Sequence, residues 1–174
     1  MRKLTTIIAS LIFTVISLTS SAQGHGLHGY YDNALGIRAG SPSGFTFKHF
    51  TSSFEAIEGI LSFWPYGFGI TGLYEIHANA FDVEGLNWYY GGGGHLHFYA
   101  LESSIDRWES RKSAAGVGLG IDGILGIEYV IPNIPFAISF DFKPCIEVTT
   151  FGDIYPAIDP GLSIRYNFGN FNSN

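Results

Sequence analysis

The sequence predicts an all-β protein: an antiparallel, up-and-down transmembrane β-barrel of about eight strands that follows an N-terminal signal peptide. Three observations carry this prediction. The first residues have the pattern of an export signal. From residue 33 onward, apolar and polar residues alternate with period two, as in strands with one apolar face. The composition is rich in aromatic residues (16%) and glycine (23 residues) and poor in charge (14%), which is typical of many closely spaced strands.

Residues 1–22 form the predicted signal peptide. Arg2 and Lys3 supply its positive start, Ile7–Leu18 its apolar core, and small residues ending at Ala22 its cleavage site. The apolar run is shorter than the ~20 residues that a spanning helix needs. No later stretch reaches that length, so any membrane crossing must use strands.

The remaining chain is interpreted as one domain. Residues 23–32 are a flexible lead-in without periodicity, 33–168 form the barrel and 169–174 are a short tail. Without the signal peptide the formal charge is 7 − 15 = −8, which argues against nucleic acid as a partner. Cys145 is the only cysteine, so no intramolecular disulfide can form and stability must come from packing and strand pairing.

The alternating segments define the expected strands in chain order. They are Asn33–Ala39, Gly44–Phe50, Phe54–Pro65, Tyr66–His77, Trp88–Tyr99, Val117–Ile131, Phe136–Val148 and Ile158–Phe168.

The first four strands differ in how clearly they alternate. The first two are short and flank a turn at Gly40–Ser43, whose Gly-Ser-Pro-Ser composition is typical of turns. The third is the least regular, although Ile57 and Leu61 share a side. The fourth alternates cleanly, with Ile70 and Tyr74 in its apolar row.

The last four strands carry most of the prediction. The strand from Trp88 contains Gly91–Gly94, a run that suits a sharply curved wall. The strand from Phe136 alternates over its whole length, more than the ~9–11 residues that a tilted membrane strand needs. Pro144 falls in its apolar row, so we expect a bulge or the rim there, because proline cannot donate to a strand ladder. The final strand alternates through Ile164 and Tyr166.

Eight is an even number of strands, as in bacterial barrels, whose two ends normally lie in the periplasm. We then expect Ala100–Ala114 to be the longest external loop and Thr150–Ala157 another. Pro132–Pro135 would be a short periplasmic turn, and Ala78–Asn87 an unusually long one.

The two faces of the strands differ in chemistry. The apolar rows hold large residues and almost no charge, so we expect them to face lipid, with tyrosines and tryptophans, Tyr89 among them, in girdles near the strand ends. A soluble barrel of the lipocalin type would have the reverse polarity, and periodicity alone does not separate the two. The opposite rows supply the predicted lumen charges: Arg38, Lys48, Glu58, Glu75, Asp122, Glu128, Asp141, Lys143, Glu147 and Arg165.

These charges are interpreted as structural. Eight strands leave room only for side chains or one small ligand, so we expect the charges to pair inside. Arg165 or Lys143 beside Asp141 or Glu147 would fit this expectation.

Three segments carry a family resemblance. They are Gly85–Gly93 (GLNWYYGGG), Asn133–Pro144 (NIPFAISFDFKP) and Gly161–Phe168 (GLSIRYNF). They resemble the small, mostly uncharacterised outer-membrane barrels of Bacteroidetes, which have an OmpA-type eight-stranded fold. The last segment also resembles the insertion signal of outer-membrane proteins, which implies that Tyr166 and Phe168 are read by the insertion machinery. The tail after Phe168 departs from that signal, which often ends at the aromatic residue. The resemblance implies a fold and a location but no activity.

Histidines offer the one candidate metal site. His95 and His97 share a strand face, and His77 is expected on the neighbouring strand. Such a cluster can bind zinc or copper. The preferred interpretation is a hydrated, hydrogen-bonded lining, with metal binding as the alternative.

We find no catalytic motif. Serines and histidines are present, but no nucleophile has a recognisable base beside it. Gly91–Gly94 lacks the lysine and helix of a phosphate loop.

The sequence therefore predicts a non-enzymatic barrel in the outer membrane of a Gram-negative bacterium, without a cofactor. Its expected partners are outer-membrane lipid, the insertion machinery and an envelope protein bound by the outer loops, where Trp108 is a candidate contact, or by the Ala78–Asn87 turn. Two alternatives stay open: a lipid-modifying enzyme of the outer membrane, and a soluble exported barrel that binds an apolar ligand.

Overall fold

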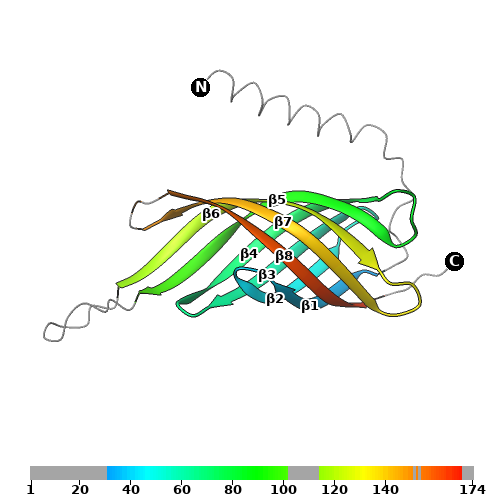
Figure 1. Ribbon diagram of the computed structural model, residues 1–174, viewed down its shortest axis with the longest axis horizontal. Helices are drawn as coiled ribbons and strands as arrows, with labels where there is room; N and C mark the ends of the chain where they lie inside the picture. Colours follow the sequence, from blue (N-terminus) through cyan, green and yellow to red (C-terminus); the bar gives the residue numbers. More distant parts are fainter. Residues whose placement is uncertain (1–30, 102–113, 151, 153, 170–174) are drawn as a thin grey trace, which may run out of the picture.

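A computed structural model describes residues 31–101, 114–150, 152 and 154–169. Eight antiparallel strands close into one barrel, each pairing with its neighbours in the chain and the last with the first (Figure 1). The strands are β1 (Asn33–Ala39), β2 (Ser43–Phe50), β3 (Glu55–Trp64), β4 (Gly67–Asn79), β5 (Leu86–Leu101), β6 (Ala114–Val130), β7 (Phe136–Thr149) and β8 (Ile154–Phe168). This confirms the predicted eight-stranded up-and-down barrel. Within the described ranges, no helix is long and apolar enough to cross a membrane.

The strands differ in length, so the barrel wall is shorter at β1 and β2 than at β5 and β6. β1 and β2 have 7 and 8 residues, whereas β5 and β6 have 16 and 17. β1 pairs with β8 only from Asn33↔Phe168 to Ala39↔Leu162. The first half of β8 therefore pairs with β7 alone. We call the end where β5 gives way to β6 the loop end, and the other the terminal end.

The structure corrects several predicted strand limits. The predicted loop Ala100–Ala114 is shorter, because β5 runs to Leu101 and β6 starts at Ala114. β8 starts at Ile154, four residues before the predicted start, and takes in Pro156 and Pro160. Both prolines lie where β8 has no second partner, so their missing N–H groups need not break a ladder. The predicted long turn at Ala78–Asn87 is shorter, because β4 and β5 still pair at Asn79↔Asn87.

Pro144 was predicted at a bulge or at the rim, and the structure shows neither. The β6–β7 pairing stops at Asp122↔Cys145 and resumes at Leu125↔Phe142. The register is the same on both sides of this gap, so no extra residue has been inserted. The ladder is interrupted where Pro144 cannot donate and then continues.

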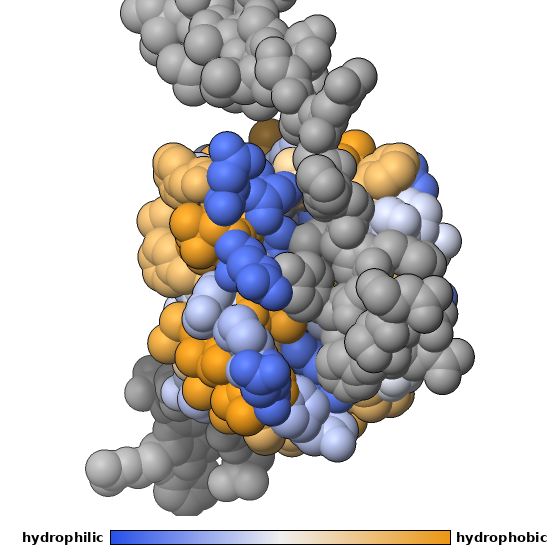
Figure 2. All heavy atoms as spheres, turned by 90° about the vertical axis from the view of Figure 1, so that its right-hand side faces the viewer, coloured by the Kyte–Doolittle hydropathy of each residue, from blue (hydrophilic) through white to orange (hydrophobic). Residues whose placement is uncertain are grey.

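The outer surface of the barrel is apolar. The predicted apolar rows point outward, and Phe136, Ile138, Phe140 and Phe142 of β7 are 40–48% exposed. Figure 2 looks onto the terminal end, where hydrophobic side chains line the sides of the barrel and hydrophilic ones gather between them. Not all predicted girdle aromatics lie outside: Tyr89 is fully buried in the lumen, and the Trp64 ring packs against His97 and Tyr99.

Inward glycines make room for the large polar side chains of the lumen. A Cβ atom on Gly126 would collide with the ring of Tyr89, and one on Gly161 with the guanidinium of Arg38. Gly91 and Gly93 serve the wall itself, since a Cβ on either would strike the backbone of β4. The predicted role of this run in a sharply curved wall matches that geometry.

Candidate functional site

The lumen is the candidate site because it holds the buried chemistry of the chain. All ten charged residues predicted to line it are buried, none more than 6% exposed. They form two layers along the barrel axis. The lower layer, near the terminal end, contains Lys48, Glu58, Glu75, Glu128 and Arg165; the upper layer, near the loop end, contains Arg38, Asp122, Asp141, Lys143, Glu147 and one further acid, Asp159.

Arg165 on β8 is the centre of the lower layer. Its guanidinium donates to Glu58 Oε1 at 2.6 Å, to Glu128 Oε2 at 3.1 Å and to the Ser139 hydroxyl at 2.7 Å. Because these partners lie on β3, β6 and β7, one side chain ties together strands from opposite sides of the barrel. Such multiple bonds are the condition under which a buried charge is tolerated.

Lys48 on β2 completes the lower layer. Its Nζ lies 2.7 Å from Glu75 Oε2 and 3.2 Å from Glu58 Oε2. The same ammonium lies 4.3 Å from the centre of the Tyr89 ring, a cation–π contact that is strong when desolvated. His77 also bonds Glu75, at 3.1 Å, so this histidine belongs to the lower layer.

Tyr31 closes the lower layer at the terminal end. Its hydroxyl donates to Glu128 Oε1 at 2.6 Å, and its ring packs edge-on against Phe50. Burial, together with the Glu128 carboxylate, holds the pKa of the Tyr31 hydroxyl well above its usual value, so it stays a donor. Tyr31, near the end of the predicted flexible lead-in 23–32, thus packs inside the barrel.

The upper layer is held by Arg38 and Lys143. Arg38 donates to Asp141 at 2.6 Å and to Asp159 at 2.7 Å. Lys143 lies 3.2 Å from Asp122 and 3.8 Å from Asp159. The predicted pairing of Arg165 or Lys143 with Asp141 or Glu147 is therefore wrong: Arg165 bonds Glu58 and Glu128, and Lys143 lies beside Asp122 and Asp159 of its two neighbouring strands.

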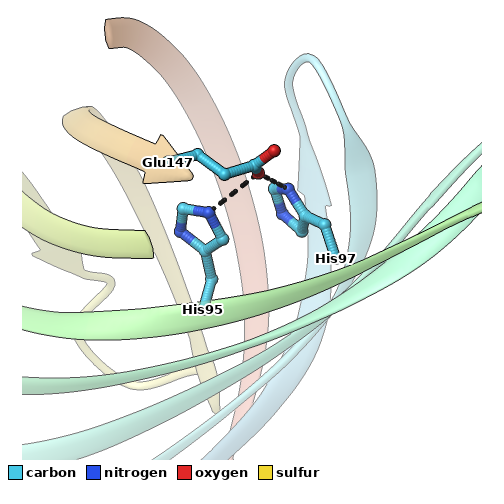
Figure 3. Close-up of side chains that lie close together, drawn as sticks. All are labelled: His95, His97 and Glu147. Carbon is cyan, nitrogen blue, oxygen red and sulfur yellow. Dashed lines mark hydrogen bonds and ion pairs between the residues drawn. The ribbon is translucent and has the colours of Figure 1, made fainter. Parts of the chain in front are cut away.

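A histidine cluster lies above these ion pairs, towards the loop end. His95 and His97 on β5 converge with Glu147 on β7 (Figure 3). Glu147 Oε2 lies 3.0 Å from His95 Nε2 and 2.5 Å from His97 Nδ1. The two imidazoles stack with their centres 4.1 Å apart. His77, the third predicted member, is in the lower layer and takes no part.

Two neighbours orient the histidine cluster. Asp122 on β6 accepts from His95 Nδ1 at 2.8 Å. The Tyr99 hydroxyl donates to Glu147 Oε1 at 2.7 Å. Beside the cluster is a cavity of about 460 Å³, lined among others by His97, Tyr99 and Glu147.

Asp159, Tyr99 and Tyr31 bond charged residues of the lumen, but the sequence analysis assigned no role to them. Asp159 has the same parity as Ser163 and Arg165, so extending β8 backwards would have found it. Tyr99 has the same parity as His95 and His97, which predicts an inward position, but it was given no role. Tyr31 precedes the alternating region, and no periodic signal marks it.

No arrangement for nucleophilic catalysis is found among the described residues. His49 bonds Asn33, His77 bonds Glu75, and the other two described histidines bond only carboxylates and Tyr99. Among the described residues, none of these histidines is hydrogen-bonded to a serine, threonine or cysteine side chain.

The remaining residues that the sequence analysis singled out are not part of the described lumen. Tyr166 and Phe168, the predicted insertion signal, lie on the outer face at the end of β8. Residues 1–22 and Trp108 lie outside the described residues.

Comparisons with known proteins support the fold alone. The crystal structure of the N-terminal β-barrel domain of Pseudomonas aeruginosa OprF is similar, with a TM-score of 0.52 and 13% identity. The match covers 78% of this chain and 95% of that one. No family model matches the sequence, and no curated protein matches it. The lumen chemistry must therefore be interpreted from this chain's own residues.

Proposed function

We propose that this protein is a non-enzymatic outer-membrane β-barrel whose lumen is closed by its own charges and whose role is structural or adhesive within the envelope. The observation that carries the proposal is the reversed polarity of the barrel. Large apolar side chains cover the outside, among them Leu119 at 64% exposure and Ile121 at 68%, while the fully buried side chains include Lys48, Glu58 and Arg165. Such an exterior is unfavourable in water and favourable in lipid.

The reversed polarity also weighs against the soluble alternative. A soluble barrel that binds an apolar ligand needs an apolar interior. Here the interior is crossed by ion pairs, and the lining of its cavity includes Lys143, Glu147 and Asp159. The lipid-modifying alternative would need a nucleophile beside a base, and no observed contact favours it.

The ion pairs support a closed lumen rather than a diffusion pore. Arg165 bridges strands across the interior, Arg38 links β1 to acids of β7 and β8, and the Tyr31 and Phe50 rings pack below them. Eight-stranded barrels have an interior just wide enough for side chains to fill. We propose that the functional surfaces are the ends of the barrel rather than a channel.

The terminal end offers one surface for an envelope partner. The turn between β4 and β5 exposes Phe81 at 72% and Val83 at 46%, and Phe81 packs against Trp88. We also propose that the chain belongs with the small Bacteroidetes barrels that its β7 and β8 segments resemble, with Tyr166 and Phe168 in the insertion signal.

Membrane fractionation with gel electrophoresis tests the location and the fold together. An outer-membrane barrel pellets with the outer membrane, resists extraction with carbonate, and changes its gel mobility when the sample is boiled. Recovery in the periplasmic fraction without detergent, with equal mobility before and after boiling, would contradict the proposal. A Gly72→Ala variant should fractionate and migrate like the wild type, because nothing lies within 4 Å of the added methyl group.

A further inference from the structure

We propose that His95, His97 and Glu147 bind one divalent transition-metal ion, with zinc(II) or copper(II) as the fitting chemistry. One ligand atom from each residue can be chosen so that all three lie within 4.8 Å of one another. Zinc bonds of about 2.0–2.2 Å place tetrahedral ligands about 3.4 Å apart. Glu147 Oε2 lies only 3.0 Å from His95 Nε2 and 2.5 Å from His97 Nδ1, so admitting an ion takes an outward movement of this carboxylate on the order of an ångström, which rotamer adjustment supplies.

The contacts of Glu147 show why a cation fits between these groups. Its Oε2 atom faces His95 Nε2 and His97 Nδ1, while Tyr99 satisfies its Oε1 atom. A carboxylate oxygen offers only lone pairs, so each facing nitrogen must present either a proton or a bound cation. One metal ion can replace both of these protons.

Asp122 prepares His95 as a ligand. Its carboxylate accepts from His95 Nδ1 at 2.8 Å, which fixes the tautomer and leaves Nε2 to face Glu147. A carboxylate behind a ligating histidine is the usual supporting contact in metal sites, where it orients the ring and raises its basicity.

The charge of the upper layer favours a divalent ion. Asp122, Asp141, Glu147 and Asp159 are four carboxylates, and Arg38 and Lys143 are two bases, which leaves a formal charge of −2 once a metal ion has replaced the histidine protons and both imidazoles are neutral. Uncompensated charge in a low-dielectric interior is unfavourable. A dication at the histidine cluster would neutralise the layer. Lys143 does not supply this charge to Glu147, because it pairs with Asp122 and Asp159.

Three glycines shape the histidine cluster. A Cβ on Gly120 would collide with the His95 ring, one on Gly69 with the His97 ring, and one on Gly118 with the Glu147 carboxylate at 2.5 Å. Each of the three proposed ligands thus lies over a glycine of a neighbouring strand. His97 and Glu147 also line the cavity, which gives an ion a route that does not cross the closed lower layer.

Titration of the detergent-solubilised full-length mature protein with zinc chloride alone, in competition with a chromophoric chelator, tests the proposal. We expect one ion per chain. We expect His95→Ala, His97→Ala and Glu147→Gln each to weaken binding at least tenfold, and Asp122→Asn to weaken it about 10–100-fold. His49→Ala, on an exposed histidine near the terminal end, is the matched control and should leave the affinity unchanged.

Three further measurements keep the result unambiguous. The heat-induced mobility shift shows whether each variant still forms the barrel, and a His25→Ala/His28→Ala variant shows whether histidines near the mature N-terminus account for any binding. Paramagnetic resonance of the copper(II) form should show two nitrogen ligands, reduced to one in His97→Ala. Absence of stoichiometric binding, or binding that survives in folded His95→Ala and His97→Ala variants, would overturn the proposal.

Discussion

At the scale of single residues, stability depends on buried charges that hold strands together across the lumen. Arg165 bonds Glu58, Glu128 and Ser139 and is 1% exposed. Removing it leaves two carboxylates buried without their main partner. Breaking a buried pair in this way destabilises a protein by about 3–5 kcal/mol.

We therefore expect Arg165→Ala to lower the free energy of unfolding by about 3–5 kcal/mol without preventing membrane insertion. Urea unfolding in lipid vesicles, followed by tryptophan fluorescence, measures the change. His49→Ala, which removes an exposed hydrogen bond, is the control and should change stability by less than about 0.5 kcal/mol. An Arg165→Ala barrel as stable as the wild type would show that the lower layer contributes nothing.

Glycines give a second prediction at this scale. Gly126→Ala places a methyl group against the Tyr89 ring, which Asp141 and Lys48 hold in place. Overpacking of this kind destabilises by about 1–3 kcal/mol. Gly72→Ala adds the same methyl group on the outer face, where nothing lies within 4 Å, and should be neutral within about 0.5 kcal/mol. Equal effects in the two unfolding curves would contradict the assigned faces.

The sequence could predict which residues face inward but not which ones bond. Parity along a strand decides the face, and all ten predicted lumen charges are buried. In a narrow barrel, however, a charged side chain can bond a residue of any strand that lies at the same position along the barrel axis. That position depends on the stagger between strands, which the sequence does not show. Arg38 thus reaches Asp159 across the β1–β8 closure, a contact between residues far apart in the chain.

At the scale of elements, strand lengths were less predictable than strand faces. The start of β8 was missed because Pro156 falls in a segment, Thr150–Ala157, that the sequence predicts as a loop. Pro156 is tolerated because that part of β8 has no partner on its other side, a property of the barrel's closure rather than of the segment. The clean alternation of β7, in contrast, was sufficient to predict the strand and its outer face.

The outer faces of the long strands can be tested with a charge. Leu125 lies on the outer face of β6 and is 56% exposed. Arginine on the lipid face of a barrel destabilises it by about 2–4 kcal/mol at the bilayer midplane and about 0–1 kcal/mol near the interface. We expect Leu125→Arg to fall in the first range and Tyr129→Arg, at the strand end, in the second. Vesicle unfolding titrations that rank the two variants in the opposite order would place β6 differently in the bilayer.

At the scale of the whole molecule, the closed lumen predicts poor conductance. Two layers of ion pairs and the Tyr31–Phe50 contact fill the interior. Reconstituted in planar bilayers, the protein should show no long-lived open channel. Arg165→Ala/Arg38→Ala should raise the frequency of conducting events, because the arginine of each ion-pair layer is lost. Large, stable channels in the wild type would contradict a closed barrel.

The central claim is that the apolar rows face lipid while the charges face one another. Spin labels at positions 138, 140 and 162, introduced as single cysteines in a Cys145→Ser background and reconstituted in vesicles, test it most directly. The account predicts that each label is more accessible to oxygen, which concentrates in lipid, than to a water-soluble nickel complex. Labels that favour the nickel complex, or that neither reagent reaches, would show that these rows do not face a membrane.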